Sequence, residues 1–538
     1  MAATAARLVC ANHDRVSQLS HVWEAMGQCL DYSRAWTLER AAAQGLPFLV
    51  QHLARQTASA LPQETDDKSL AMDFAAGNGH LAILTWLHDT QQLSSCSTRA
   101  MDDAAKNGYS AIVQWLHVHR SEGCTTRAMD YAASNGHLSV VQWLHEHRPE
   151  GSTPRAMDLA AQNGHLHVLQ WLHDNRSEGC TVSAVDYAAT EGHLHTVRWL
   201  CDVRKEVCSS SAMVGAARGG HLSILQYLSK QFATLFESVS AKMVHAAVAN
   251  GQRAVLEWLA AVLPVKSLKC EEAVGSWMEV ACQYGQTGIL KWFHDHAAEL
   301  PMGVDKHSAC TASAVVNAAR NGHDDVLVYL QENDLIDLTT ESSAMDALVA
   351  AVEGGHRNCV EWLVTTFRTL YATVPCTTTT AMDTAAASGH VDLLQFLRDE
   401  RTTTKWRTSY KAVERAARYG FVDVLRWLHF DDHSNVVEEG VRLQVEEANR
   451  LERRWTPMAL EMAATNGHLA VVQWLIEHHR NVCSSVEAFN AACYMDHVPV
   501  AQYLYSNVRS SCSVEQALEQ ANEGGAEDTL CWLRGLPI

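Results

Sequence analysis

The sequence of 538 residues contains no run of 18 apolar residues, and no apolar stretch follows a basic start within Met1 to His13. We therefore expect no membrane span, no signal peptide and no membrane partner. Basic residues are also scarce: 42 Lys and Arg against 61 Asp and Glu give a formal net charge of −19. Because phosphate binding is built on Lys and Arg, this balance predicts a basic protein partner and no nucleic acid.

The sequence also lacks the short motifs of common catalytic sites. Cys-x-x-Cys, His-Glu-x-x-His, Gly-x-Ser-x-Gly and Gly-x-x-x-x-Gly-Lys-Ser/Thr do not occur, so redox, zinc, serine-nucleophile and phosphate-loop chemistry have no signature here. Sixteen cysteines are present, but many recur at a constant spacing, as Cys96, Cys124, Cys180 and Cys208 do. In stacked repeats such residues lie about 8–10 Å apart, beyond the roughly 7 Å Cα limit of a disulfide. We expect reduced thiols and a cytoplasmic or nuclear location.

What the sequence does contain is a repeat. The signature at Ala128 to Trp143 returns along the chain, every 28 or 29 residues between its second and seventh copies. A fixed period of this length indicates a stack of one supersecondary unit. One alanine is present in every copy and predicts close approach of neighbouring helices, since overpacking a core costs ~1–3 kcal/mol. These alanines are Ala41, Ala75, Ala104, Ala132, Ala160, Ala188, Ala216, Ala247, Ala281, Ala318, Ala351, Ala385, Ala416, Ala463, Ala492 and Ala521.

Two helices are predicted in each copy. The first helix starts at a Thr or Ser cap, as at Thr153-Pro154, and ends at the Gly that follows the Ala by four residues in fifteen copies, where a left-handed residue fits. The second helix carries an apolar stripe, as at Leu138, Val141 and Leu144. Seven residues after the Gly an aromatic residue stands in fifteen copies, such as Trp143.

The segment Ala-Ala-x-x-Gly-His-Leu-x-Val-Val, found at Ala132 to Val141 and Ala463 to Val472, resembles the ankyrin repeat, and the resemblance covers nearly the whole chain. Ankyrin repeats open with Thr-Pro-Leu-His, whereas the aligned Leu-His positions here read Met-Asp, as at Met129-Asp130. Only eight residues of separation lie between His145 and Thr153, too few for the extended ankyrin finger. We therefore expect a divergent, fingerless variant of about 28 residues per repeat and an all-α solenoid of stacked helix-turn-helix units.

Spacing divides the array. We expect a helical lead-in or cap at 1–35, regular repeats 1–7 at 36–229, repeats 8–13 with longer connections at 230–429, an inserted amphipathic helix at 430–455, and repeats 14–16 with a C-terminal cap at 456–538. The longer connections could restore fingers or lengthen helices. The inserted helix either folds back on the stack, which we favour, or binds a partner.

Repeats run from about Trp36 to Leu533 and leave no space for a catalytic domain, so we expect no enzyme activity, no metal and no cofactor. The histidine ladders His137, His165, His193, His221 and His117, His145, His173 are evenly spaced along the array. Equivalent residues in stacked helices lie about 8–10 Å apart, too far to share a metal. A structural role is predicted for the first ladder and a partly exposed helix face for the second.

Ankyrin proteins commonly bind other proteins through the concave face of their first helices, and the resemblance implies the same here. Residues five and two positions before the Gly vary while the frame is constant, so we expect them to line this face. We therefore predict a non-catalytic protein-interaction scaffold or adaptor of undetermined oligomeric state. Two alternatives are a substrate-recruiting subunit of a larger enzyme complex, such as a ubiquitin ligase, and, less favoured, a helical-repeat nucleic-acid binder. The candidate binding residues are Phe74, Asp103, Lys106, Tyr131, Ser134, Leu159, Gln162, Tyr187, Thr190 and Arg218.

Overall fold

The structure is a computed structural model, in which every regular element of the described part of the chain is a helix. None of these helices combines the length and apolar character needed to cross a bilayer. The contacts divide the chain into two compact units, unit 1 (Met1–Val239) and unit 2 (Ser240–Ile538). The described residues are 36–59, 70–90, 96–263, 277–296, 312–335, 341–368, 371, 375–399, 406, 408–438, 455–479, 486–507 and 513–536.

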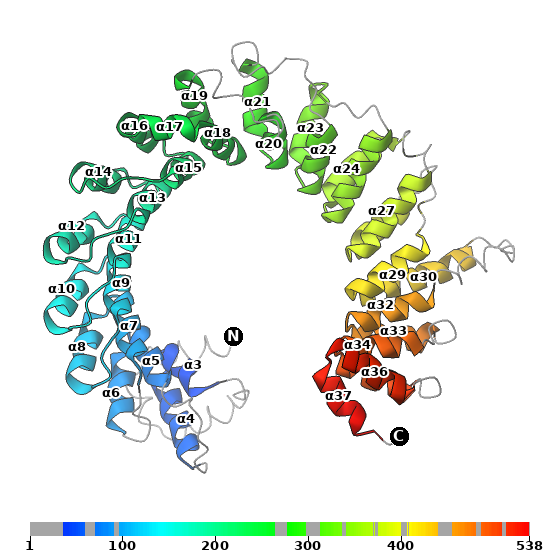
Figure 1. Cartoon of the computed structure of the whole chain (residues 1–538), viewed down its shortest axis with the longest axis horizontal. Coiled ribbons are helices and arrows are strands. Elements are labelled where there is room, and N and C mark those ends of the chain that lie inside the picture. The colour runs from blue at the N-terminus through cyan, green and yellow to red at the C-terminus, as the bar shows by residue number, and fades with distance from the viewer. Residues whose placement is uncertain are drawn as a thin grey trace, which may run out of the picture. The chain divides into compact units, whose positions relative to one another are not determined.

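Unit 1 consists of helix pairs whose first helices pack in one row and whose second helices pack in another (Figure 1). The row of first helices forms the concave side of this unit. The first helices are α3 (Leu38–Ala43), α5 (Leu70–Gly77), α7 (Thr98–Lys106), α9 (Thr126–Ser134), α11 (Arg155–Gln162), α13 (Ser183–Thr190) and α15 (Ser210–Gly219). The second helices are α4 (Pro47–Ser59), α6 (Leu81–Asp89), α8 (Ser110–His119), α10 (Leu138–His147), α12 (Leu166–Asn175), α14 (Leu194–Asp202) and α16 (Leu222–Gln231), after which comes the short α17 (Ala233–Ser238).

Unit 2 repeats the same arrangement of paired helices. Its first helices are α18 (Ser240–Ala249), α20 (Trp277–Gln283), α22 (Ala312–Arg320), α24 (Glu341–Glu353), α27 (Pro375–Ala387), α29 (Tyr410–Tyr419), α32 (Pro457–Thr465), α34 (Val486–Tyr494) and α36 (Val514–Gly524). Its second helices are α19 (Arg253–Val262), α21 (Thr287–His296), α23 (Asp324–Glu332), α25 (Arg357–Thr366), α28 (Val391–Asp399), α30 (Val422–Glu438), α33 (Leu469–His479), α35 (Val498–Asn507) and α37 (Glu527–Arg534).

The core lies between the two rows of helices. Each of the sixteen repeated alanines, from Ala41 to Ala521, is on a first helix and has 0% exposure. Val140, Val141 and Leu144 of α10 are buried on the facing side of the second helix. The predicted close approach of neighbouring first helices is therefore confirmed.

The glycine between the two helices meets two requirements at once. Gly136 has φ 78°, a left-handed conformation that costs other residues about 1–2 kcal/mol. A Cβ atom at Gly136 would also lie 2.7 Å from Nδ1 of His165 in the next repeat. The ring at this position also reaches back to the preceding repeat, since His221 Nε2 lies 3.0 Å from the carbonyl oxygen of Thr190. The first histidine ladder is therefore part of the packing between repeats.

These features confirm the predicted α-solenoid of stacked helix-turn-helix repeats. Between residues 96 and 239 no strand interrupts the helix pairs, and at Arg148 the backbone is extended (φ −126°, ψ 129°) where the chain leaves α10. The lead-in at 1–35 lies outside the described residues, as do most connections of repeats 8–13. The helix α30 runs to Glu438, but residues 439–454 of the expected insertion are also outside. The domain boundaries stay a prediction.

Candidate functional site

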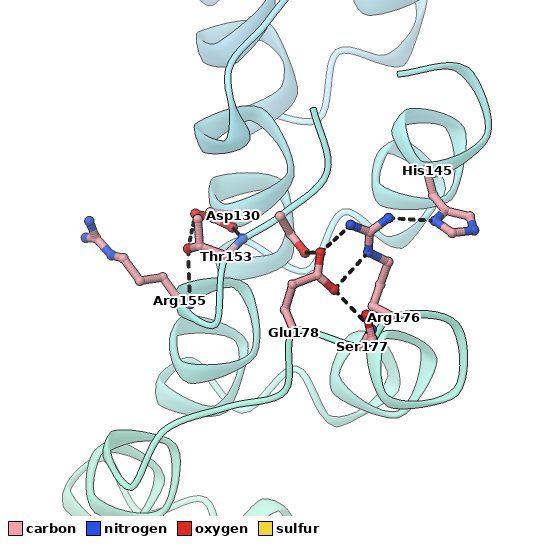
Figure 2. Close-up of polar contacts among 8 residues, drawn as sticks. Asp130, His145, Thr153, Arg155, Arg176, Ser177 and Glu178 are labelled. Atoms are coloured by element: carbon pink, nitrogen blue, oxygen red, sulfur yellow. Dashed lines mark hydrogen bonds and ion pairs between the residues drawn. The ribbon is translucent and has the colours of Figure 1, made fainter. Parts of the chain in front are cut away.

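A buried carboxylate joins each repeat to the next in copies two to six. Asp130 of α9 accepts hydrogen bonds from the backbone N–H of Thr153 (2.8 Å) and from its hydroxyl (2.7 Å), as Figure 2 shows. The Thr153 oxygen in turn accepts from the N–H of Arg155 (3.3 Å) and so caps α11. The cap of one repeat is thus held by the preceding repeat. The equivalent pairs are Asp73–Ser97, Asp102–Thr125, Asp158–Thr181, Asp186–Ser209 and, in unit 2, Asp383–Ser409.

Burial is the main influence on these carboxylates. It raises the pKa of Asp73, Asp102 and Asp130, while the hydrogen bonds from the Ser or Thr partner work in the opposite direction. The Met-Asp departure from the ankyrin opening therefore has a structural use. The sequence carried a signal for it, namely an Asp followed by Ser or Thr 23 residues later, as at Asp130 and Thr153.

A second connection lies in the loops after α8, α10, α12 and α14. Arg176 pairs with Glu178, with Arg176 Nε 3.2 Å from Glu178 Oε2. Nη1 of Arg176 lies 3.3 Å from Nδ1 of His145 in the preceding repeat (Figure 2). Burial would raise the pKa of Glu178, but the hydrogen bonds from Arg176 and from the backbone outweigh it and lower the pKa. Equivalent pairs are Arg120–Glu122, Arg148–Glu150 and Arg204–Glu206.

The second histidine ladder also connects repeats. His117 meets the ring of Trp143 edge-on at a centroid distance of 5.2 Å, and His145 meets Trp171 in the same way at 5.3 Å. Edge-to-face contacts at this distance stabilise aromatic packing. In the described part of the chain, no group of three or more His, Cys, Asp or Glu side chains is arranged to hold a metal ion.

All ten candidate binding residues lie on the first helices of unit 1, from α5 to α15. The side chains of Phe74, Lys106, Tyr187 and Arg218 are exposed, and the other six are half-buried. The Thr190 hydroxyl already donates a hydrogen bond to the carbonyl oxygen of Asp186 at 2.8 Å. The structure thus brings the predicted residues onto one accessible side of the row. Their part in binding stays a prediction.

The sequence-based selection missed a row of arginines on the same side. Arg99, Arg127 and Arg155 are exposed and stand nine residues before the Gly of their copies. The guanidinium carbon of Arg127 lies 5.5 Å from the ring centroid of Tyr131, and Lys106 Nζ of the neighbouring helix lies 5.7 Å from it. Helical spacing could have found these residues, because positions nine, five and two before the Gly share one helix face. We call these three positions in unit 1 the first-helix face.

The fold and its connections define a helical-repeat protein. The family model for ankyrin repeats (three copies) matches this chain at residues 102–186, 129–209, 278–373 and 315–408. These segments of the chain carry ankyrin repeats, and the resemblance seen in the sequence is confirmed there. No curated protein matches it.

Solved structures of the pentatricopeptide repeat protein PPR10 also match. Two of them, one a triple cysteine-to-serine variant, are complexes with an 18-nt psaJ RNA element; each has 11% identity and a TM-score of 0.35, and covers 99% of this chain and 92% of the other. The third, PPR10 from maize, has 10% identity and a TM-score of 0.28 and covers 99% and 82%. At these identities the likeness concerns the helical-repeat fold alone.

One sequence-based prediction is wrong. It excluded nucleic acid as a partner, yet helical-repeat proteins crystallised with RNA are among the structures that match this chain. The prediction failed because it judged the binding surface by the net charge of the whole chain, −19. That charge does not describe the first-helix face, where Arg99, Lys106, Arg127 and Arg155 are exposed. The expectation of a basic protein partner rested on the same net charge and stays a prediction.

Proposed function

We propose that this chain is a non-catalytic scaffold or adaptor that binds a protein partner on the first-helix face of unit 1. One observation carries the proposal: side chains that differ from copy to copy, including Phe74, Tyr131 and Tyr187, sit accessibly on a frame of uniformly buried alanines. A constant frame fixes their positions, and aromatic residues are those that most often dominate binding energy at protein interfaces.

We also propose a cytoplasmic or nuclear location. Cys96, Cys124 and Cys208 form no disulfide and are buried. Burial raises the pKa of the Cys124 thiol to about 11, so it stays protonated and unreactive at neutral pH. Unpaired thiols of this kind are typical of reducing compartments.

The test is capture of partners from the native cell by the full chain. The Tyr131→Ala, Gln162→Ala and Tyr187→Ala changes are combined and compared with Gln114→Ala, Gln170→Ala and Arg198→Ala. The control residues lie on second helices, each six residues after the Gly of its copy. We expect the first variant to lose the partners and the control to retain them. Equal capture by both variants would refute the assignment of the face.

A further inference from the structure

The arginine row on the first-helix face has a regular geometry. Arg99, Arg127 and Arg155 stand at one repeat position, in the first turn of α7, α9 and α11. Figure 2 shows the Arg155 side chain extending away from the helices, on the side opposite the Arg176–Glu178 pair. The row therefore presents guanidinium groups at a constant spacing, about 8–10 Å for packed helices.

The three arginines are exposed, and the guanidinium group of Arg127 also contacts the Tyr131 side chain. In the described part of the chain no carboxylate lies within ion-pair distance of Arg127 or Arg155, and Arg99 has only the loose contact to Asp103 at 4.0 Å. Each guanidinium group offers five N–H donors in a planar fork that matches a carboxylate. The row also influences Asp73, Asp102 and Asp130, which are buried and hold the helix caps. Asp103, which is half-buried on the same face, interacts with Arg127 as well as with Arg99.

The spacing of the row matches one backbone conformation of a protein segment. Polyproline II has three residues per turn and rises about 3.1 Å per residue, so every third side chain points the same way at intervals of about 9.3 Å. Proline-rich segments in this conformation dock against aromatic side chains. Tyr131 supplies such a ring within the row, and Phe74 and Tyr187 supply others on the same face.

We propose that the arginine row binds an acidic, proline-rich protein segment in the polyproline II conformation, with Asp or Glu at every third position. The proposal rests on the protein-binding function above and names the chemistry of its partner. A nucleic-acid strand is the other polyanion to consider. Arginine pairs bidentately with phosphate as well as with carboxylate, so the choice depends on spacing. The phosphates of a helical strand recur about every 3.4 Å, whereas every third side chain of polyproline II recurs at about 9.3 Å, which matches the row. A protein segment is therefore favoured.

The test measures fluorescence anisotropy of a labelled peptide with six Glu-Pro-Pro repeats, added to the full chain at low salt. A peptide of the same composition with all six glutamates in one block controls for spacing. We expect the periodic peptide to bind at least about tenfold more tightly, and its affinity to fall as salt is raised. Equal binding of the two peptides would overturn the proposal.

The matched variants use the chain's own alternatives. The next two copies have serine at the position of the row, at Ser183 and Ser211. The variants Arg99→Ser, Arg127→Ser and Arg155→Ser therefore introduce a residue that this repeat position already accepts. The control removes three exposed cations elsewhere in unit 1, by Arg198→Ser, Lys205→Asn and Lys230→Ser. With circular dichroism and urea midpoints unchanged, the row variant should bind the periodic peptide at least tenfold more weakly, and the control as wild type. Unchanged binding by the row variant would overturn the proposal.

Two further outcomes separate this proposal from the function on which it rests. An oligouridine that binds more tightly than the peptide and displaces it would overturn the assignment of a protein segment. If the periodic peptide does not bind while partner capture still depends on Tyr131, Gln162 and Tyr187, the partner chemistry is wrong and the binding face stands. If the periodic peptide does not bind and partner capture does not depend on these three residues, the binding face itself is wrong.

Discussion

At the scale of single residues, the stack is joined by hydrogen bonds that run from one repeat to the next. Asp130 accepts two of them from Thr153 and is buried, with 5% of its surface exposed. Removing one partner of a buried hydrogen bond costs more than the bond itself contributes, because the other partner is left unsatisfied. Small buried polar residues therefore contribute to stability here in addition to the apolar core.

Asp130→Ala should lower the urea midpoint of the full chain by the equivalent of about 1–3 kcal/mol. Asp130→Asn should cost less, because its amide oxygen can still accept one hydrogen bond from Thr153. Asp174→Ala, an exposed aspartate on α12, is the control and should change little. If Asp174→Ala is as costly as Asp130→Ala, the carboxylate does not join the repeats.

Two substitutions should show opposite dependence on pH. Because burial raises the pKa of Asp130, the folded state holds the proton more tightly than the unfolded chain. The contribution of Asp130 is then greatest at low pH and is lost as pH rises through the folded pKa. Wild type should therefore gain stability relative to Asp130→Asn as pH falls from 7 to about 4.

Glu150 should behave in the reverse way. Burial would raise its pKa, but the hydrogen bonds from Arg148 and from the backbone prevail, so the pKa lies below the ordinary 4.5. Its contribution is present above pH 4.5 and is lost as pH falls below that value, so wild type should lose stability relative to Glu150→Gln as pH falls from about 4.5 to about 3. Urea midpoints measured from pH 7 to about 3 check both substitutions; a change in the same direction for both would contradict the assignment.

The turn glycine can be tested against a glycine without a neighbour. Gly136→Ala should be destabilised by its left-handed backbone, about 1–2 kcal/mol, and further by contact with the His165 ring, about 1–3 kcal/mol. At Gly525, φ is also positive (69°) but nothing lies within 4 Å of an added Cβ, so Gly525→Ala should incur only the first cost. Adding His165→Ala to Gly136→Ala should recover part of the loss; equal midpoints for the two single variants would refute the contact.

At the scale of helices, unit 2 contains an aromatic cluster that joins α30 to α33. Trp455, which precedes α32, stacks on His479 at a centroid distance of 3.7 Å, and Trp474 stacks on His478 at 4.7 Å. His429 of α30 meets Trp474 edge-on at 5.6 Å, and its Nδ1 lies 3.1 Å from Nε2 of His479. These contacts fasten together two repeats that the sequence separates most widely.

Trp455→Ala should loosen this junction, because deletion of a buried Trp side chain costs about 3–5 kcal/mol. Hydrogen exchange should accelerate in peptides from α33 and stay unchanged in peptides from α10 of unit 1. Tyr410→Ala, which removes an aromatic side chain that is 48% exposed, is the control. Unchanged exchange in α33 after Trp455→Ala would show that the cluster does not hold the junction.

The helix pairs were predictable, because their signals are local. The alanines, the capping Thr153 and the turn at Gly136 can each be recognised from residues within one copy, and all lie where the sequence places them. The contacts between copies were less predictable. The Asp130–Thr153 bond and the ring of His165 over Gly136 depend on the orientation of neighbouring repeats, and nothing within one copy specifies that orientation.

At the scale of the whole molecule, net charge was a poor guide to partners. The chain carries −19 overall, but its charges are distributed unevenly. The aspartates that hold the caps in copies two to six are buried, while Arg99, Arg127 and Arg155 are exposed on the first-helix face, where Asp103 is half-buried. A partner meets the local surface at contact distance, since charges farther than about 8 Å away are largely screened at physiological salt.

Site-directed photo-crosslinking tests the binding face most directly. A photoreactive amino acid replaces Gln162 on α11 or, as the matched control, Gln170 on α12 of the same repeat. After irradiation in the native cell, we expect protein adducts from position 162 and none above background from position 170, because only the first-helix face binds a partner. Equal adducts at both positions, or adducts from position 170 alone, would contradict the account.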